Sequence, residues 1–174
     1  MQRVLNGKTA VITGASRGIG AATARRFAAE GANLVLTART LEQHPTLPGS
    51  LNETAQVCRG LGADVLVIQA DLADEESRLR IIPMALEKFG TINILVNNAV
   101  AAIYKALDQY ALKHRRLMTE INVQAPLDLI QQSLPSMYEV GEGWIINLSS
   151  GSKKHPEGPP YDLGGVRGVY GFYG

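Results

Sequence analysis

One glycine-rich turn organises the chain, and it reads Thr13-Gly14-Ala15-Ser16-Arg17-Gly18-Ile19-Gly20. The short run before it, 9–13, is rich in β-branched residues and stops at glycine, which predicts a parallel strand buried on both faces. The alanine-rich segment after it, 19–30, predicts a helix. Between them, Gly14 allows a tight exit from the strand, Gly18 lets the backbone approach a phosphate, and Gly20 lets helix and sheet pack closely.

The same alternation of strand and helix continues along the chain. Periodicity predicts further strands over 33–37, 65–69, 92–97 and 144–148, helices over 51–61 and 74–89, and a long, largely helical stretch over 107–140. Strands joined by crossover helices predict a parallel sheet covered on both faces. The fold class is therefore α/β, a Rossmann-like doubly wound sheet in a single domain, residues 1–174.

Several details of these elements follow from single residues. In the first helix we expect Ile19, Thr23 and Phe27 to form one apolar stripe. Pro83 should kink the 74–89 helix, and the long stretch should be interrupted near Pro126 and Pro135. Glycine and proline make 41–50 and 153–171 look like insertions that lie on the surface or line a cleft.

Composition restricts the partners. Seventeen basic and sixteen acidic side chains give a net charge of +1, which argues against a nucleic-acid or membrane-surface footprint and favours a small-molecule partner. Cys58 is the only cysteine, so no disulfide within the chain is possible, and a reducing, cytoplasmic location is expected. No signal peptide or membrane span is evident. His44, His114 and His155 are scattered, and no metal site is expected.

The Gly-x3-Gly-x-Gly spacing after a threonine resembles the short-chain dehydrogenase/reductase family. Further motifs follow in the family's order: Asp71-Leu72, Asn97-Asn98-Ala99, Asn122, and Asn147-Leu148-Ser149-Ser150. The resemblance implies that a nicotinamide dinucleotide binds with Asp71 and Leu72 against its adenine and Asn98 and Ala99 on the adenosine ribose side. Val100 departs from the glycine that is usual in the family. The turn residues implied to hold the phosphates are Gly14, Ser16, Arg17, Gly18, Ile19 and Gly20.

The choice between the two nicotinamide cofactors depends on the end of the second strand. An acidic side chain there would accept hydrogen bonds from a free 2′-hydroxyl and repel a 2′-phosphate, but this sequence has Thr37-Ala38-Arg39-Thr40. Arg39 and Arg17 can both pair with a phosphate, which favours NADP(H) and leaves NAD(H) possible. The alternative for Arg39 is an ordinary exposed arginine at the end of a strand.

The family's catalytic residues are Asn, Ser, Tyr and Lys. Carried over by motif, Ser150 orients the carbonyl, with Ser149 as the alternative, and Asn122 anchors a proton-relaying water chain. Without the other motifs, Asn122 could instead be a buried polar residue that mends a helix irregularity before Pro126. The acid/base tyrosine is assigned to Tyr173, because Tyr173-Gly174 resembles the opening of the family's Tyr-Gly-x-x-Lys form.

No tyrosine after Ser150 has a lysine four positions later, which separates this sequence from the family pattern. Tyr161 and Tyr170 are each followed at that distance by glycine. Because a nearby ammonium lowers the pKa of tyrosine, we expect the 174 residues alone to be close to inactive, and we expect them to be a C-terminally incomplete form of a longer enzyme whose last strands are missing.

Two functions remain open. The first is an NADP(H)-dependent short-chain dehydrogenase/reductase acting on a carbonyl or alcohol substrate, with Tyr173 donating the proton. The second is a dinucleotide-binding sensor or regulatory module without catalysis. The resemblance also implies a homo-oligomer, a dimer or tetramer, whereas the basic group at 113–116 is most simply a solvated helix face.

Overall fold

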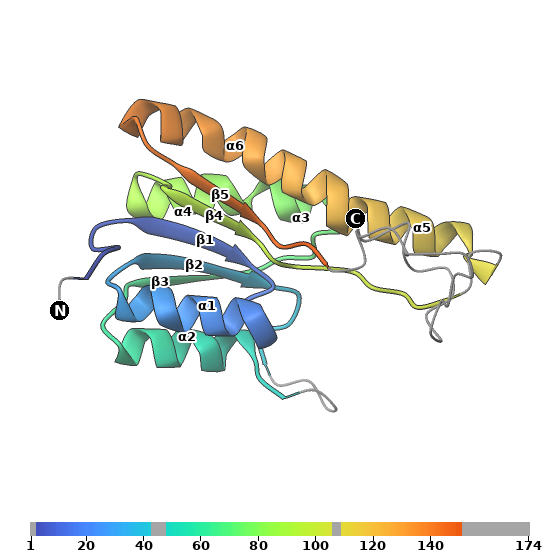
Figure 1. Cartoon of the computed structure of the whole chain (residues 1–174), viewed down its shortest axis with the longest axis horizontal. Helices are drawn as coiled ribbons and strands as arrows, with labels where there is room; N and C mark the ends of the chain where they lie inside the picture. The colour runs from blue at the N-terminus through green and yellow to red at the C-terminus, as the bar shows by residue number, and fades with distance from the viewer. Residues whose placement is uncertain (1–2, 43–47, 106–108, 151–174) are drawn as a thin grey trace, which may run out of the picture.

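Five parallel strands form one sheet in the order β3-β2-β1-β4-β5, in a computed structural model that describes residues 3–42, 48–105 and 109–150 (Figure 1). The strands are β1 (Thr9–Thr13), β2 (Asn33–Ala38), β3 (Val65–Gln69), β4 (Ile94–Asn97) and β5 (Trp144–Asn147). The helices are α1 (Gly18–Ala29), α2 (Leu51–Gly60), α3 (Glu75–Leu79), α4 (Ile81–Phe89), α5 (Leu112–Thr119), the π-helix η2 (Glu120–Gln124) and α6 (Ala125–Val140).

This architecture confirms the α/β doubly wound prediction. The first and third strands have the predicted bounds, the second is one residue longer, the fourth begins at Ile94 rather than 92, and the fifth ends at Asn147. Within the described residues, no helix is both long and apolar enough to span a bilayer.

Side-chain alternation in β1 divides the core into two layers. Ala10 and Ile12 pack with residues of α1 and α2 in one cluster, while Val11 packs with residues of α4, η2 and α6 in the other. Figure 1 shows α1 and α2 on one face of the sheet and α4 and α6 on the other. Since successive side chains of a strand point to opposite faces, a strand buried throughout needs helices on both sides, and β1 is buried along its whole length.

The predicted stripe of α1 is wrong. Ile19 is 64% exposed and Thr23 and Phe27 are only partly buried. Helix α1 instead faces the sheet with its smallest residues, which are Gly20, Ala21, Ala24 and Ala28. Small side chains let a helix axis approach the sheet closely, and the larger residues are left at the margin of the contact.

The single helix predicted over 74–89 is also wrong, because the chain breaks between α3 and α4 at Arg80. Pro83, which should have kinked one helix, lies in the first turn of α4. A proline has no N–H to bond the carbonyl four residues earlier, which here belongs to Leu79. That carbonyl instead accepts a hydrogen bond from Gln132 Nε2 at 3.0 Å, so α6 satisfies the group that Pro83 leaves unpaired.

The long helical stretch switches from α-helix to π-helix before Pro126 rather than at it. Helix α5 passes into η2, and Pro126 then lies in the first turn of α6, where its missing N–H costs little. The predicted interruption near Pro135 is wrong, because α6 continues through it to Val140.

Strand β5 lies at an edge of the sheet and carries apolar side chains. Trp144, Ile145 and Ile146 are 36–47% exposed in the described part of the chain. Its backbone pairs with β4 in register, from Ile94 opposite Trp144 to Asn97 opposite Asn147.

Candidate functional site

The glycine turn lies where the direction of strand order reverses. The chain runs outward from β1 through β2 to β3, then crosses back to β4 on the other side of β1. Ligands of open α/β sheets bind outside the carboxyl ends of the strands at this point. The turn leaves β1 there and enters α1, and Ala15 N–H donates to Thr37 O of β2 at 3.1 Å.

A network of hydrogen bonds joins the other side of the glycine turn to the end of β4. Asn98 Nδ2 donates to Thr13 O at 2.8 Å and to Gly14 O at 3.2 Å. Thr13 Oγ1 accepts the N–H groups of Asn98 and Ala99, each at 3.0 Å, and donates to Val96 O at 3.3 Å. Asn98 therefore ties the glycine turn to the end of β4, and its expected contact with the adenosine ribose stays a prediction. The role of Thr13 was missed, although a polar residue ending a buried strand was its signal.

The glycines of the turn divide into two kinds. A Cβ on Gly14 would lie 2.9 Å from Asn98 Nδ2, and one on Gly20 would lie 2.5 Å from the same atom and closer still to Gly14 O. These two glycines keep the turn packed against β4. A Cβ on Gly18, by contrast, would meet no atom within 4 Å of the described structure, and Gly18 has φ +56°. Its backbone is therefore open to an approaching group, as a pyrophosphate-binding glycine requires.

Helix α1 begins without the groups that usually satisfy a helix N-terminus. Arg17 occupies the N-cap in an extended conformation, no side chain caps the helix, and no acidic residue lies in its first turn. The first amides of a helix carry a partial positive charge and need acceptors. An uncapped N-terminus beside an open glycine therefore has the donor set that fits a phosphate group.

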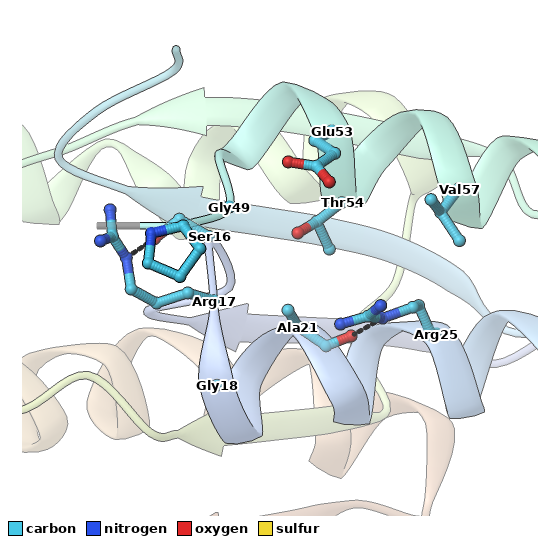
Figure 2. Close-up of a pocket in the computed structure, with 10 residues that line it drawn as sticks. Ser16, Arg17, Gly18, Ala21, Arg25, Gly49, Glu53, Thr54 and Val57 are labelled. Atoms are coloured by element: carbon cyan, nitrogen blue, oxygen red, sulfur yellow. Dashed lines mark hydrogen bonds between the residues drawn. The ribbon is translucent and has the colours of Figure 1, made fainter. Parts of the chain in front are cut away.

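The two arginines expected to bind the 2′-phosphate come from different segments. Arg17 is the N-cap residue of α1, and Arg39 directly follows β2. Arg17 Nε donates to Ser16 Oγ at 3.5 Å, and its Nη1 is buried with no hydrogen-bond partner in the described part of the chain. Figure 2 shows Arg17 and Arg25 at opposite ends of a cavity of about 240 Å³ that lies between α1 and α2. The side chain of Arg39 is exposed at the end of β2, where Gln69 Nε2 holds its carbonyl at 2.9 Å.

The Asp71-Leu72 segment follows the carboxyl end of β3, on the same side of the sheet as the glycine turn. Asp71 is exposed and accepts from Ala73 N at 3.0 Å, whereas Leu72 is 7% exposed and packs in the core. The Leu72 carbonyl accepts from Arg78 Nη1 at 3.3 Å. Of the two residues expected beside the adenine, Asp71 is the one that presents its side chain at the surface.

Arg78 links this segment to the helices that cover the other face. It is 5% exposed and donates to Asp128 at 2.6 Å and to Glu120 of η2 at 3.0 Å. Burial lowers the pKa of Arg78, but the hydrogen bond and charge of Asp128, and then Glu120, outweigh it and raise the pKa above its ordinary value. The sequence held no local signal for this cluster, because its acids lie 42 and 50 residues away.

Asn122 lies in η2, and its side chain is hydrogen-bonded to the loop that follows β4. Its Oδ1 accepts from Ala101 N at 2.9 Å and its Nδ2 donates to Ala101 O at 3.0 Å. Both ends of the amide are thus bonded to one residue. The alternative considered for Asn122 was a buried polar residue that mends a helix irregularity, whereas in the structure Asn122 is partly buried and its amide binds the loop after β4 rather than the helix. Its part in a proton relay stays a prediction.

Ser149 and Ser150 follow β5 at the carboxyl edge of the sheet. Ser149 is exposed and Ser150 is partly buried. Just before them, Asn97 Nδ2 donates to Asn147 Oδ1 at 2.8 Å, and Leu148 N donates to Asn97 O at 3.0 Å, so β4 and β5 end at the same level. Tyr161, Tyr170 and Tyr173 lie outside the described residues, as does the 153–171 insertion.

These observations place most of the predicted cofactor residues, and Ser150, at or just after the carboxyl ends of the strands, while Asn122 lies in η2 and binds the loop after β4. This side of the sheet bears open backbone at Gly18, one buried guanidinium donor without a partner in the described residues, and a serine that follows the outermost strand. In the described residues, no group of three or more His, Cys, Asp or Glu side chains is placed to hold a metal ion.

Comparison with known proteins gives a consistent result. The family model described as short chain dehydrogenase matches residues 8–162. Hydroxysteroid dehydrogenase-like protein 2 from Bos taurus is 38% identical over 83% of this chain and 35% of its own length, so the chain spans about a third of that relative.

Similar solved structures include complexes with nicotinamide cofactors. A metagenomic short-chain oxidoreductase in complex with NADP has a TM-score of 0.79 and 31% identity, covering 96% of this chain and 73% of its own. Carveol dehydrogenase from Mycobacterium avium in complex with NAD has a TM-score of 0.76 and 29% identity, covering 89% of this chain and 58% of its own. With the family match over most of its length, the chain belongs to the short-chain dehydrogenase family of NAD(P)-dependent oxidoreductases.

Proposed function

We propose that the protein transfers a hydride between NADP(H) and a carbonyl or alcohol substrate. The observation that carries the proposal is the entry to α1, where open backbone at Gly18 adjoins an uncapped helix N-terminus. Oriented amides and a helix dipole stabilise a pyrophosphate without further charge. The family match supports the nicotinamide part of the assignment.

The preference for NADP(H) rests on charge at the 2′ side of the adenosine ribose. Arg17 has a buried Nη1 with no partner among the described residues, and Arg39 is exposed at the end of β2, where an NAD(H)-specific site would carry an acid. A buried donor left without an acceptor costs about 1–3 kcal/mol, and a phosphate oxygen would remove that cost.

In the proposed reaction the bound cofactor supplies a hydride to the carbonyl carbon from its nicotinamide ring. The Ser150 hydroxyl holds the carbonyl oxygen by donating a hydrogen bond. Tyr173 gives that oxygen a proton as negative charge develops, so that the carbonyl becomes an alcohol. In the reverse direction Tyr173 would take the proton back from the alcohol oxygen.

Asn122 enters this scheme through its backbone. Its side-chain amide is bonded at both ends to Ala101. Pro126, four residues later, has no N–H to give the Asn122 carbonyl its α-helical partner. The carbonyl is therefore the group that we assign to the proton-relaying water.

The cofactor assignment is tested by titrating the full 174-residue chain with NADPH and NADH and following nicotinamide fluorescence. We expect NADPH to bind about tenfold more tightly, which corresponds to one charge-assisted hydrogen bond. Arg39→Gln should reduce this ratio, while Arg26→Gln, which changes an exposed arginine in the last turn of α1, should leave it unchanged. Binding of neither nucleotide would overturn the proposal.

A second candidate is a dinucleotide-binding sensor without catalysis, because Tyr161 and Tyr170 are each followed four positions later by glycine rather than by the family's lysine. NADPH oxidation, measured against a panel of ketones and aldehydes, separates the two. Tight binding with no turnover favours the sensor, and substrate-dependent oxidation favours the enzyme.

We further propose that the protein is a cytoplasmic homo-oligomer. Val123 of η2 and Leu127 of α6 are 49% and 50% exposed on the long helical stretch, which suits a contact between copies. Light scattering behind size-exclusion chromatography tests the assembly, and a monomeric mass at high protein concentration would contradict it.

A further inference from the structure

Hydrogen bonds join the residues that follow β2 to the start of α2. Asn52 N donates to Leu41 O at 3.1 Å, and Asn52 Nδ2 donates to Glu42 at 2.7 Å. Ser50, which is 5% exposed, caps α2 by accepting from Glu53 N at 3.0 Å. The residue before this cap, Gly49, is therefore held in a fixed place by the start of α2.

Gly49 lies directly against the outer side of the glycine turn. It has φ +85°, in the left-handed region that favours glycine. A Cβ added there would lie 2.9 Å from Ser16 O and 3.5 Å from Arg17 Cβ. No real Cβ is tolerated that close to a backbone oxygen, so any side chain at this position must push the Ser16-Arg17 backbone away.

Gly49 and Pro48 also line the cavity between α1 and α2, together with Ser16, Arg17 and Gly18 (Figure 2). The two arginines of the lining differ. Arg25 Nε donates to Ala21 O of its own helix at 3.1 Å, whereas Arg17 Nη1 is buried and has no acceptor within the described ranges. Arg17 is thus the lining cation with a buried donor that lacks an acceptor among the described residues, and an anion oxygen bound in the cavity would supply one.

We propose that Gly49 is a specificity-determining residue, whose missing side chain lets the segment after β2 hold Arg17 where its guanidinium meets the 2′-phosphate of NADP(H). The inference rests on the proposed function, because it explains how that site selects its cofactor. Gly49 touches the turn and no nucleotide is required to touch it, so it acts through the position of Arg17.

A change at Gly49 should affect the binding of NADPH and NADH differently. The amides at Gly18 and the start of α1 bind the pyrophosphate, which NADPH and NADH share. Displacement of Arg17 removes a charge-assisted contact that only NADPH makes. A change at Gly49 should therefore reduce the discrimination between the two cofactors more than it reduces their common affinity.

The test compares Gly49→Ala with Gly62→Ala in the full chain. Gly62 has φ +92°, so alanine meets the same backbone strain there, but its nearest contact is Arg3 Nη1 at 3.8 Å, away from the turn. We expect Gly49→Ala to raise the Kd for NADPH about tenfold with the Kd for NADH nearly unchanged. Gly62→Ala should change neither Kd, and circular dichroism reports whether each variant is folded.

A double-mutant cycle keeps the test decisive. In an Arg17→Gln background, Gly49→Ala should no longer affect NADPH binding, because the group it displaces is gone. Equal loss of NADPH and NADH affinity, or an effect that persists in the Arg17→Gln background, overturns the role of Gly49. If Gly49→Ala fails to fold where Gly62→Ala folds, Gly49→Asn, which tolerates positive φ, must show the same selective loss, or the inference is wrong. Wild-type protein that binds neither nucleotide overturns the proposed function itself.

Discussion

Helices α1 and α2 start at the same edge of the sheet and lie side by side on one face, yet their N-termini are built differently. Helix α2 has a Ser50 cap and an acid, Glu53, in its first turn. Helix α1 has arginine at its N-cap, no capping side chain and no acid in its first turn.

In the function proposed above, the capped end of α2 serves stability and the uncapped end of α1 serves a ligand. Capping satisfies amides inside the protein and typically contributes about 1 kcal/mol. Helix α1 forgoes that contribution, and its amides remain directed at the cleft beside Gly18. The two helices also differ in their glycines: a Cβ on Gly20, in the first turn of α1, would meet Gly14 O and Asn98 Nδ2, whereas one on Gly60, the last residue of α2, would meet nothing within 4 Å of the described structure.

The largest effect should come from the enclosed glycine. Gly20→Ala places a Cβ against Gly14 O and Asn98 Nδ2, which should lower the free energy of unfolding by about 2–3 kcal/mol and abolish NADPH binding. The comparison change Gly60→Ala, at the last residue of α2, meets no atom within 4 Å of the described residues and should raise stability by about 0.5 kcal/mol or less, because helix propensity counts less at a helix end. Urea unfolding measures both, and equal effects would remove the distinction between the two helices.

Loss of the α2 cap should have an intermediate effect. Ser50→Ala removes the acceptor for Glu53 N and should lower the free energy of unfolding by about 1 kcal/mol. Because α2 binds no pyrophosphate in this scheme, the Kd for NADH should stay within about twofold of wild type. A large loss of NADH affinity would show that α2 also serves the ligand.

The smallest effect should come from giving α1 the cap that it lacks. Arg17→Ser and Arg17→Gln both remove the guanidinium, but of the two only serine is a preferred N-cap residue that accepts from the first-turn amides. We expect Arg17→Ser to be more stable than Arg17→Gln by about 0.5 kcal/mol and to bind NADH more weakly, because its hydroxyl competes for the same amides. Thermal unfolding and NADH titration of the pair test this, and identical behaviour would mean that these amides are not available.

Much of the fold could be predicted from local patterns. Buried strands that end at glycine or asparagine, and a glycine-rich turn before an alanine-rich helix, gave the sheet and the location of the cofactor residues. The errors came from contacts with distant residues. Whether Pro83 kinks a helix or starts one depends on Gln132, and which face of α1 is buried depends on how closely the sheet can be approached.

The candidate site shows the same division. Gly14 and Gly18 could be placed from the local spacing of the turn after a strand, and Asn98 from the resemblance to the family. Arg78 could not be placed, because its meaning depends on Glu120 and Asp128 across the fold. Gly49 was hidden within a segment that composition marked only as an insertion.

The Thr13 hydroxyl bonded to the amides of Asn98 and Ala99 has a further consequence, which concerns entropy. Hydrogen bonds within the folded sheet join the glycine turn to β4 on one side and to β2 on the other. A nucleotide therefore meets a preorganised loop, and little of its binding free energy is lost to restricting the backbone. The amides of Asn98 and Ala99 should accordingly exchange with solvent only when β1 and β4 separate, with or without a ligand.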